Sequence, residues 1–246
     1  MQYEEATWYS DRVNRNMTVR VYGHYGEAVI AFPCQDKGSD DFYLNGMIDA
    51  LAPLIESGRM KLFCVDSNDE SSVSSGSWDQ ARAAYHLERY HHYLVEEVLP
   101  FVYAKQCGHC LPYLVGASMG GSHAANHFFR RPDLFKGFIA LSASFDIARF
   151  FNGYFNEDVY RNSPVHYLSG MDKSHPYIDL YNAKTLCVVV GEGRYEHLVR
   201  YTNLWLQDIA NEKGIRIWFN FWDANSVHDW VSWRYQLPYF LQRIFS

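Results

Sequence analysis

The sequence predicts an α/β fold in which helices cover both faces of a mostly parallel sheet. Short apolar runs typical of buried strands alternate with longer segments whose apolar residues recur at helical spacing. The 246 residues contain no internal repeat, no low-complexity tract and no linker-like segment. We therefore expect a single domain over residues 1–246, long enough to bury a sizeable core.

The predicted strands are of two kinds. Residues 17–24 alternate between apolar and polar side chains, as in a half-exposed strand, and we expect this segment to enter the sheet antiparallel. The others are short apolar runs that suit strands buried on both faces: residues 28–32, 60–65, 111–115, 138–142, 186–190 and 215–219.

Helical spacing of apolar residues predicts the helices: residues 44–55, 78–104, 122–130, 198–212 and 230–244. The first is closed by Gly58, a typical stop, and the second is expected to kink at Pro100. Between residues 144 and 185 the pattern is irregular and rich in Phe, Tyr and Asn. We expect this segment to form a lid or one wall of a substrate site.

Composition and charge narrow the range of partners. A net charge of -6 and a pI near 6.0 give no electrostatic reason to expect nucleic acid or an anionic membrane, so a small neutral or weakly charged substrate suits the chain better. Five cysteines, an odd number, agree with a reducing compartment. The first residues lack the features of a signal peptide, and no apolar run approaches a membrane span. We expect a cytoplasmic protein, monomeric or homo-oligomeric, without a cofactor or metal ion.

Residues 114–121 (Leu-Val-Gly-Ala-Ser-Met-Gly-Gly) are the most informative stretch of the chain. They place a Gly-x-Ser-x-Gly pattern between a predicted strand and a predicted helix, which is the setting of a nucleophile elbow. In such a turn the serine adopts strained backbone geometry, and small residues on either side let the chain pass without clashes. The pattern therefore predicts that Ser118 is a nucleophile held at the edge of the sheet.

A serine hydroxyl needs a base to take its proton, and histidine is the natural base at neutral pH. His228 lies between the last predicted strand and the last predicted helix. Loops at the carboxyl ends of parallel strands carry the sites of open α/β sheets, so His228 is the predicted base. The remaining histidines on predicted helices are expected to be packed or surface groups: His86, His91, His92, His123 and His127.

A third group, an acid, must hold the base in the right tautomer, and the chain order serine, acid, histidine places it after the strand predicted at 186–190. Two glutamates are candidates there: Glu192 follows the strand directly, and Glu196 lies where the next helix begins. Asp223 and Asp229 adjoin the histidine in sequence and are set aside, because sequence neighbours rarely bond through their side chains as a triad requires.

An acyl-transfer site also needs N–H donors for the oxyanion. The backbone amide of Met119, next after the nucleophile, is expected to supply one at the start of the helix. The second is expected from the loop after the strand 28–32, where the amides of Cys34 and Gln35 are the candidates.

Three segments carry a resemblance to a known family: residues 116–126 (Gly-Ala-Ser-Met-Gly-Gly-Ser-His-Ala-Ala-Asn), 191–196 (Gly-Glu-Gly-Arg-Tyr-Glu) and 227–241 (Val-His-Asp-Trp-Val-Ser-Trp-Arg-Tyr-Gln-Leu-Pro-Tyr-Phe-Leu). They resemble the putative esterase family, a branch of the α/β hydrolases that includes esterase D, enterochelin esterases, feruloyl esterase domains and mycolyltransferases. The resemblance covers nearly the whole chain and is most specific at His-Asp-Trp. It implies an α/β-hydrolase fold.

The resemblance also implies a catalytic triad at Ser118, Glu196 and His228. Many relatives place an aspartate soon after the glycine of the penultimate strand, where this chain has Arg194, so Glu192 is kept as the reserve acid. The implied reaction is hydrolysis of a carboxylic ester, in which the serine attacks, an acyl-enzyme forms and an activated water releases the acyl group.

The substrate is not fixed by the resemblance, because the family handles short acyl, aromatic acyl and sugar esters. Aromatic residues between Phe145 and Tyr181 make an aromatic or plant-wall ester one of the candidate substrates. Two alternatives stay open: an acyltransferase with the same triad, and a binding protein that keeps the fold without turnover.

Two other motifs have competing interpretations. Residues 107–110 (Cys-Gly-His-Cys) have the spacing of a redox dithiol, but they follow a predicted helix and precede a strand, the reverse of the setting that lowers a thiol pKa, so we expect a connecting turn. Residues 66–70 begin like a calcium loop, but Ser71 and Ser77 replace the required glycine and glutamate. We expect a solvated loop there.

Overall fold

The computed structural model describes residues 1–106, 108 and 110–245. In this part of the chain eight strands form one sheet in the order β1-β2-β4-β3-β5-β6-β7-β8. The pairs β1 with β2 and β2 with β4 are antiparallel, and the remaining pairs are parallel. The strands are β1 (Tyr3–Ser10), β2 (Arg15–Tyr22), β3 (Glu27–Phe32), β4 (Met60–Val65), β5 (Tyr113–Ala117), β6 (Gly137–Leu141), β7 (Thr185–Val190) and β8 (Trp218–Phe221).

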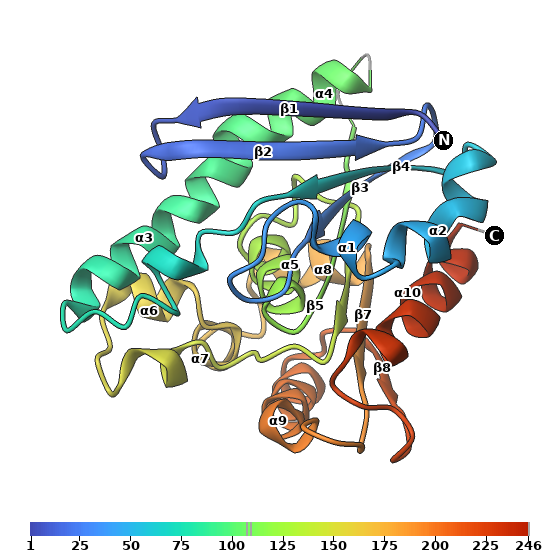
Figure 1. Cartoon of the computed structure of the whole chain (residues 1–246). Helices are drawn as coiled ribbons and strands as arrows, with labels where there is room; N and C mark the ends of the chain where they lie inside the picture. Colours follow the sequence, from blue (N-terminus) through green and yellow to red (C-terminus); the bar gives the residue numbers. More distant parts are fainter. Residues whose placement is uncertain (107, 109, 246) are drawn as a thin grey trace.

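Helices cover both faces of this sheet (Figure 1). They are α1 (Asp41–Leu44), α2 (Met47–Glu56), α3 (Gln80–Tyr93), α4 (Leu99–Lys105), α5 (Met119–Arg130), α6 (Glu157–Arg161), α7 (Pro164–Ser169), α8 (Pro176–Asn182), α9 (His197–Lys213) and α10 (Trp230–Ile244). The helices α1, α2 and α10 pack on one face, and α3, α4, α5, α7, α8 and α9 pack on the other.

Strand β3 shows why this arrangement holds together. Val29 and Ala31 point into the core under α2 and α10, whereas Ile30 and Phe32 point into the core under α3 and α5. All four side chains are fully buried. A strand that is apolar on both sides needs cover on both sides, so the predicted α/β class with a mostly parallel, two-sided sheet is confirmed.

Several boundaries differ from the predicted ones. Strand β1 was not predicted, because it is an exposed edge strand without a continuous apolar face. Residues 41–44 form the separate helix α1, and Gly46, at φ 71°, divides it from α2. The last strand begins at Trp218 instead of residue 215, because Ile215 packs in the core after α9.

The long predicted helix and the irregular segment also differ. A π-helical turn over Leu94–Val98 joins α3 to α4, and Pro100, where a kink was predicted, lies in the first turn of α4, where its missing N–H is tolerated. Residues 144–185 are not irregular, since they contain a 3-10 turn (Ala148–Phe151) and the helices α6, α7 and α8. Within the described residues no helix has the length and apolar character needed to cross a membrane.

Candidate active site

Ser118 lies at the turn from β5 into α5 and adopts φ 54° and ψ -125°, a conformation that non-glycine residues rarely occupy. The neighbouring glycines permit it. A Cβ on Gly116 would lie 2.3 Å from the carbonyl carbon of Gly120, and a Cβ on Gly120 would lie 2.3 Å from the carbonyl oxygen of Phe32. The glycines therefore let the turn close tightly and bring it against the end of β3.

His228 approaches the serine from the loop between β8 and α10. Its Nε2 lies 2.9 Å from Ser118 Oγ, at hydrogen-bond distance. The loop is fixed by backbone bonds to the β7 loop: His228 N–H donates to the Arg194 carbonyl at 3.0 Å, and Gly193 N–H donates to the Ser226 carbonyl at 2.8 Å. The fold thus brings together Ser118 and His228, which are 110 positions apart in sequence.

Glu196 lies behind the histidine at the start of α9. Its Oε2 is 3.8 Å from His228 Nδ1, beyond hydrogen-bond distance, and its side chain is 0% exposed. Both of these atoms are buried and have no hydrogen-bond partner in the described part of the chain. Catalytic hydrogen bonds are often long in ligand-free enzymes and tighten when substrate binds. Glu192, by contrast, is an exposed residue that pairs with Arg200 at 2.8 Å.

A buried chain of hydrogen bonds holds the carboxylate of Glu196. Ser142 Oγ donates to Glu196 Oε1 at 2.6 Å, and Trp233 Nε1 donates to Ser142 Oγ at 2.9 Å. The Trp233 ring also packs edge-on against the His228 imidazole, with centroids 5.1 Å apart and an interplanar angle of 79°. Trp233 therefore contacts the His228 imidazole directly and the Glu196 carboxylate through Ser142.

Ser142 and Trp233, which link His228 and Glu196, were not among the residues predicted from the sequence. Ser142 ends a predicted strand at the same edge as Ser118, and its φ of 48° is a second strained position there. Trp233 lies within the segment 227–241 that carries the family resemblance. These placements signal proximity to the site, but neither reveals a hydrogen bond between residues 91 positions apart.

The two candidate amides in the loop after β3, Cys34 and Gln35, differ in their hydrogen bonding. The Cys34 amide donates to Asp41 Oδ2 at 2.8 Å, so it is already engaged. The Gln35 amide has no acceptor among the described residues, and Gln35 lines the same cavity as Ser118 and Met119. Met119 is the first residue of α5, where a backbone N–H has no partner within the helix.

The Cys34 thiol is a poor nucleophile, because burial and the neighbouring Asp41 raise its pKa well above the usual range.

The cavity beside Ser118 is small, about 190 Å³. Its lining residues come from the loops and first helical turns that follow β3, β5, β6, β7 and β8: Gln35, Ser118, Met119, Ser122, Ser144, Arg149, Phe150, Leu198, Val199 and His228. Pockets for drug-sized ligands are larger, about 300–1,000 Å³. Among the aromatic residues of segment 144–185, Phe150 lines this cavity, whereas Phe145, Phe151 and Tyr181 are buried in the cores.

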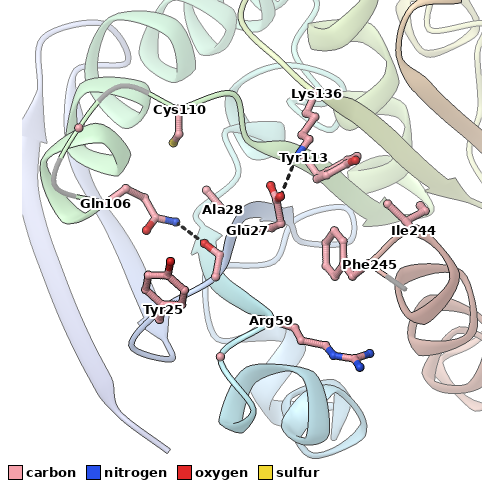
Figure 2. A pocket seen from close by; sticks show the side chains of 13 residues that line it. Tyr25, Glu27, Ala28, Arg59, Gln106, Cys110, Tyr113, Lys136, Ile244 and Phe245 are labelled. Atoms are coloured by element: carbon pink, nitrogen blue, oxygen red, sulfur yellow. Dashed lines mark hydrogen bonds and ion pairs between the residues drawn. The ribbon is translucent and has the colours of Figure 1, made fainter.

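A larger hollow of about 820 Å³ lies at the opposite end of the parallel strands, where β3 and β5 begin (Figure 2). Its described lining residues include no serine or histidine, and Lys136 Nζ pairs there with Glu27 Oε1 at 2.6 Å. Its one described thiol, Cys110, has a pKa raised by burial. The larger hollow therefore lacks the contact between a strained serine and a histidine that the smaller cavity contains.

The other predicted candidates lie elsewhere. His123 Nε2 contacts Asp69 Oδ1, and His91 Nδ1 contacts His127 Nδ1, both at 2.9 Å and buried under α3 and α5. These histidines are packed groups, as expected. The solvated loop predicted at residues 66–70 was wrong, because Asp66 accepts two backbone amides and Asp69 is buried against the histidine.

No metal site or redox pair emerges from the described residues. They contain no group of three or more His, Cys, Asp or Glu side chains that could hold a metal ion. The described cysteines, Cys34, Cys64, Cys110 and Cys187, are free. The turn predicted at residues 107–110 includes Cys107 and His109, which lie outside the described residues.

The match to known proteins extends along the chain. A family model described as "Putative esterase" matches residues 10–244. No curated protein matches the chain significantly.

Solved structures share the fold over nearly the full length. A ferulic acid esterase is 18% identical with a TM-score of 0.75, over 99% of this chain and 98% of that chain. An S-formylglutathione hydrolase from Agrobacterium tumefaciens is 13% identical with a TM-score of 0.73, over 99% and 94%. FphF, a fluorophosphonate-binding serine hydrolase of Staphylococcus aureus, is 13% identical with a TM-score of 0.68, over 100% and 98%. The α/β-hydrolase fold is confirmed.

Proposed function

Because the chain belongs to the putative esterase family, we propose that it is a serine esterase that hydrolyses a carboxylic ester through an acyl-enzyme. The observation that carries the proposal is the 2.9 Å contact between His228 Nε2 and Ser118 Oγ at a strained turn. A hydroxyl in that setting can lose its proton to the imidazole as it attacks a carbonyl carbon.

The reaction proceeds in two halves. Ser118 Oγ bonds to the ester carbonyl carbon while His228 Nε2 takes its proton, and the amides of Met119 and Gln35 donate to the oxyanion. The imidazolium then gives the proton to the departing alcohol, leaving the acyl group on the serine. A water that loses a proton to His228 attacks the acyl-enzyme. The imidazolium then returns that proton to Ser118 Oγ as the bond to the acyl carbon breaks and the acid leaves. Glu196 stabilises the imidazolium in both halves.

The cavity favours a small acyl or alcohol group next to the reacting bond. Its volume of about 190 Å³ leaves little room for a large rigid group. Arg149 and Phe150 come from segment 144–185, so we assign to this segment the role of one wall of the substrate site. Larger parts of a substrate would extend into solvent past Leu198, which is 47% exposed.

Hydrolysis of 4-nitrophenyl esters of graded chain length tests the proposal. We expect the protein to hydrolyse acetate and butyrate esters faster than octanoate esters, with a burst of nitrophenol when deacylation is slow. Ser118→Ala should abolish turnover. Ser57→Ala, at the end of α2, is a matched control that should keep it.

Two outcomes would change the assignment. Ester products formed in the presence of an added alcohol, at the expense of the free acid, would make the protein an acyltransferase with the same nucleophile. Absence of turnover and of a burst with every ester would support a binding protein that uses the fold without catalysis.

A further inference from the structure

Arg149 is a positively charged group in the wall of the catalytic cavity. It lies in the 3-10 turn Ala148–Phe151 that follows β6, and it lines the cavity together with Ser118 and His228. Its Nη1 donates to the carbonyl of Leu198. Its guanidinium carbon lies 5.5 Å from the centre of the Phe150 ring and 5.6 Å from that of Tyr201. The side chain is therefore held in place although it is exposed.

The charge of Arg149 is not neutralised by any residue that the structure describes. No described carboxylate lies within salt-bridge distance of it, whereas Glu192 pairs with Arg200 at 2.8 Å and Asp146 contacts His166 at 3.2 Å. The bond to the Leu198 carbonyl uses one of five N–H donors of a guanidinium. Free donors and a full positive charge thus remain at the site, in a protein whose net charge is -6.

We propose that Arg149 binds a carboxylate of the substrate, so that the preferred substrates are esters that carry a carboxylate close to the reacting ester bond. This inference rests on the proposed esterase function. A guanidinium recognises a carboxylate through parallel N–H donors, and its weak hydration suits a partly covered site. Phe150, Leu198 and Val199 supply apolar contacts for the carbon atoms between the two groups.

The small cavity limits the distance between the carboxylate and the ester. The serine, the base and the arginine line the same space of about 190 Å³, so one compact molecule can contact all three. The carboxylate can belong to the acyl part or to the alcohol part of the ester. The two sources share the same recognition by Arg149 and are separated by the experiment.

The test compares esters that differ in the carboxylate and match in shape. Methyl hydrogen succinate and methyl 4-methylpentanoate place a carboxylate or an isopropyl group at the same point of the acyl chain. The acetate esters of 4-hydroxybenzoate and 4-hydroxybenzamide make the same comparison on the alcohol side. Values of kcat and KM are measured for the unaltered protein, Arg149→Gln and Arg149→Lys. Arg59→Gln is the matched control, because Arg59 is exposed at the opposite end of the parallel strands (Figure 2).

We expect kcat/KM of the unaltered protein to favour the carboxylate ester in at least one pair by about tenfold, the value of one hydrogen bond to a charged group. Arg149→Gln should remove that preference through a higher KM and leave the neutral ester within about twofold. Arg149→Lys should keep part of the preference. Added salt should weaken it, because the interaction is electrostatic and partly exposed, and Arg59→Gln should change nothing.

Equal kcat/KM for both members of both pairs overturns the inference while leaving the esterase function intact. So does an Arg149→Gln protein that loses the same factor on charged and neutral esters, since that result shows a structural role. A protein that hydrolyses neither the four test esters nor 4-nitrophenyl acetate overturns the proposed function itself, and the role of Arg149 with it.

Discussion

Two histidine–carboxylate pairs of this protein differ in what surrounds them. His123 Nε2 lies 2.9 Å from Asp69 Oδ1, closer than the 3.8 Å between His228 Nδ1 and Glu196 Oε2. The His123 pair is nevertheless buried, with 4% and 1% of the side chains exposed, and neither residue is among the described residues that line the cavity beside Ser118. His228 is 19% exposed, and its second ring nitrogen contacts a strained serine. A short distance between imidazole and carboxylate is therefore a weaker sign of catalysis than an accessible nucleophile beyond the imidazole.

His91 and His127, which lie near His123, also differ from His228 in their surroundings. Burial, and then the charges of nearby basic groups, lower the pKa of His91 and His127 well below 6.5. The two rings share an Nδ1 contact at 2.9 Å, which requires one donor and one acceptor and hence at least one neutral ring. Groups held in this way pack the space between α3 and α5. They cannot exchange protons with a substrate.

The largest expected effect separates the two pairs by activity. His228→Ala should lower kcat by about 10⁴-fold, because the serine loses its base. His123→Ala should leave kcat within a few fold and instead lower the melting temperature, because it leaves the buried Asp69 without its partner. Steady-state kinetics and thermal unfolding of both variants check this, and the reverse pattern would contradict the comparison.

The second effect tests which acid serves the base. Glu196→Gln should lower kcat by about 10³-fold, since the amide cannot stabilise an imidazolium as a carboxylate does. Glu192→Gln removes only an exposed ion pair with Arg200 and should leave kcat within about twofold. Kinetics of the two variants are compared at the same pH. A larger loss of kcat in Glu192→Gln than in Glu196→Gln would identify Glu192, in the exposed loop, as the acid.

The third effect concerns the buried rings and pH. Because the folded-state pKa values of His91 and His127 are lowered, the unfolded chain binds more protons below pH 6.5, so stability falls as the pH drops below that value. At pH 5.5 the loss is about 1.4 kcal/mol for each ring that stays neutral, or up to about 3 kcal/mol for both. Urea unfolding at pH 7.5 and 5.5 measures it.

A double variant, His91→Phe with His127→Phe, provides the control for this pH effect. It should show a smaller loss of unfolding free energy between the two pH values, whatever its stability at pH 7.5. An unchanged pH dependence would assign the acid sensitivity to other groups.

The smallest effect tests the support behind His228. Trp233→Phe keeps the ring packing and removes the N–H that donates to Ser142, and Ser142→Ala removes the donor to Glu196. Each should lower kcat by about tenfold with little change in KM, because the carboxylate is less well positioned while the substrate contacts remain. Trp230→Phe, on the same helix, is the matched control and should keep kcat. Equal losses in all three variants would indicate a general structural effect.

The parts of this site that sequence could predict are local ones. The strand, turn and helix around Ser118 could be predicted because they follow one another within about a dozen residues, and the loop position of His228 could be predicted because it follows the last strand. The sheet could be predicted because apolar runs indicated strands buried on both faces. Strand β1 was not, because an exposed edge strand needs no continuous apolar pattern.

The rest depends on contacts between distant segments. Glu192 and Glu196 are four residues apart, and the turn that brings only Glu196 inward passes through Tyr195 at φ 68°. The engagement of the Cys34 amide by Asp41 and the link from Trp233 to Ser142 are set by side-chain packing. No periodicity encodes such contacts. The preference for Glu196 over Glu192 rested on the family resemblance, and the choice between the Cys34 and Gln35 amides stayed open.

Covalent labelling with a fluorophosphonate tests the central claim most directly, because the reagent requires an activated serine and no knowledge of the substrate. Mass mapping should find one adduct, on the peptide that contains Ser118; it should be absent in Ser118→Ala and form far more slowly in His228→Ala. An unlabelled native protein, or an adduct that persists in Ser118→Ala, would contradict the claim that Ser118 and His228 form the reactive pair.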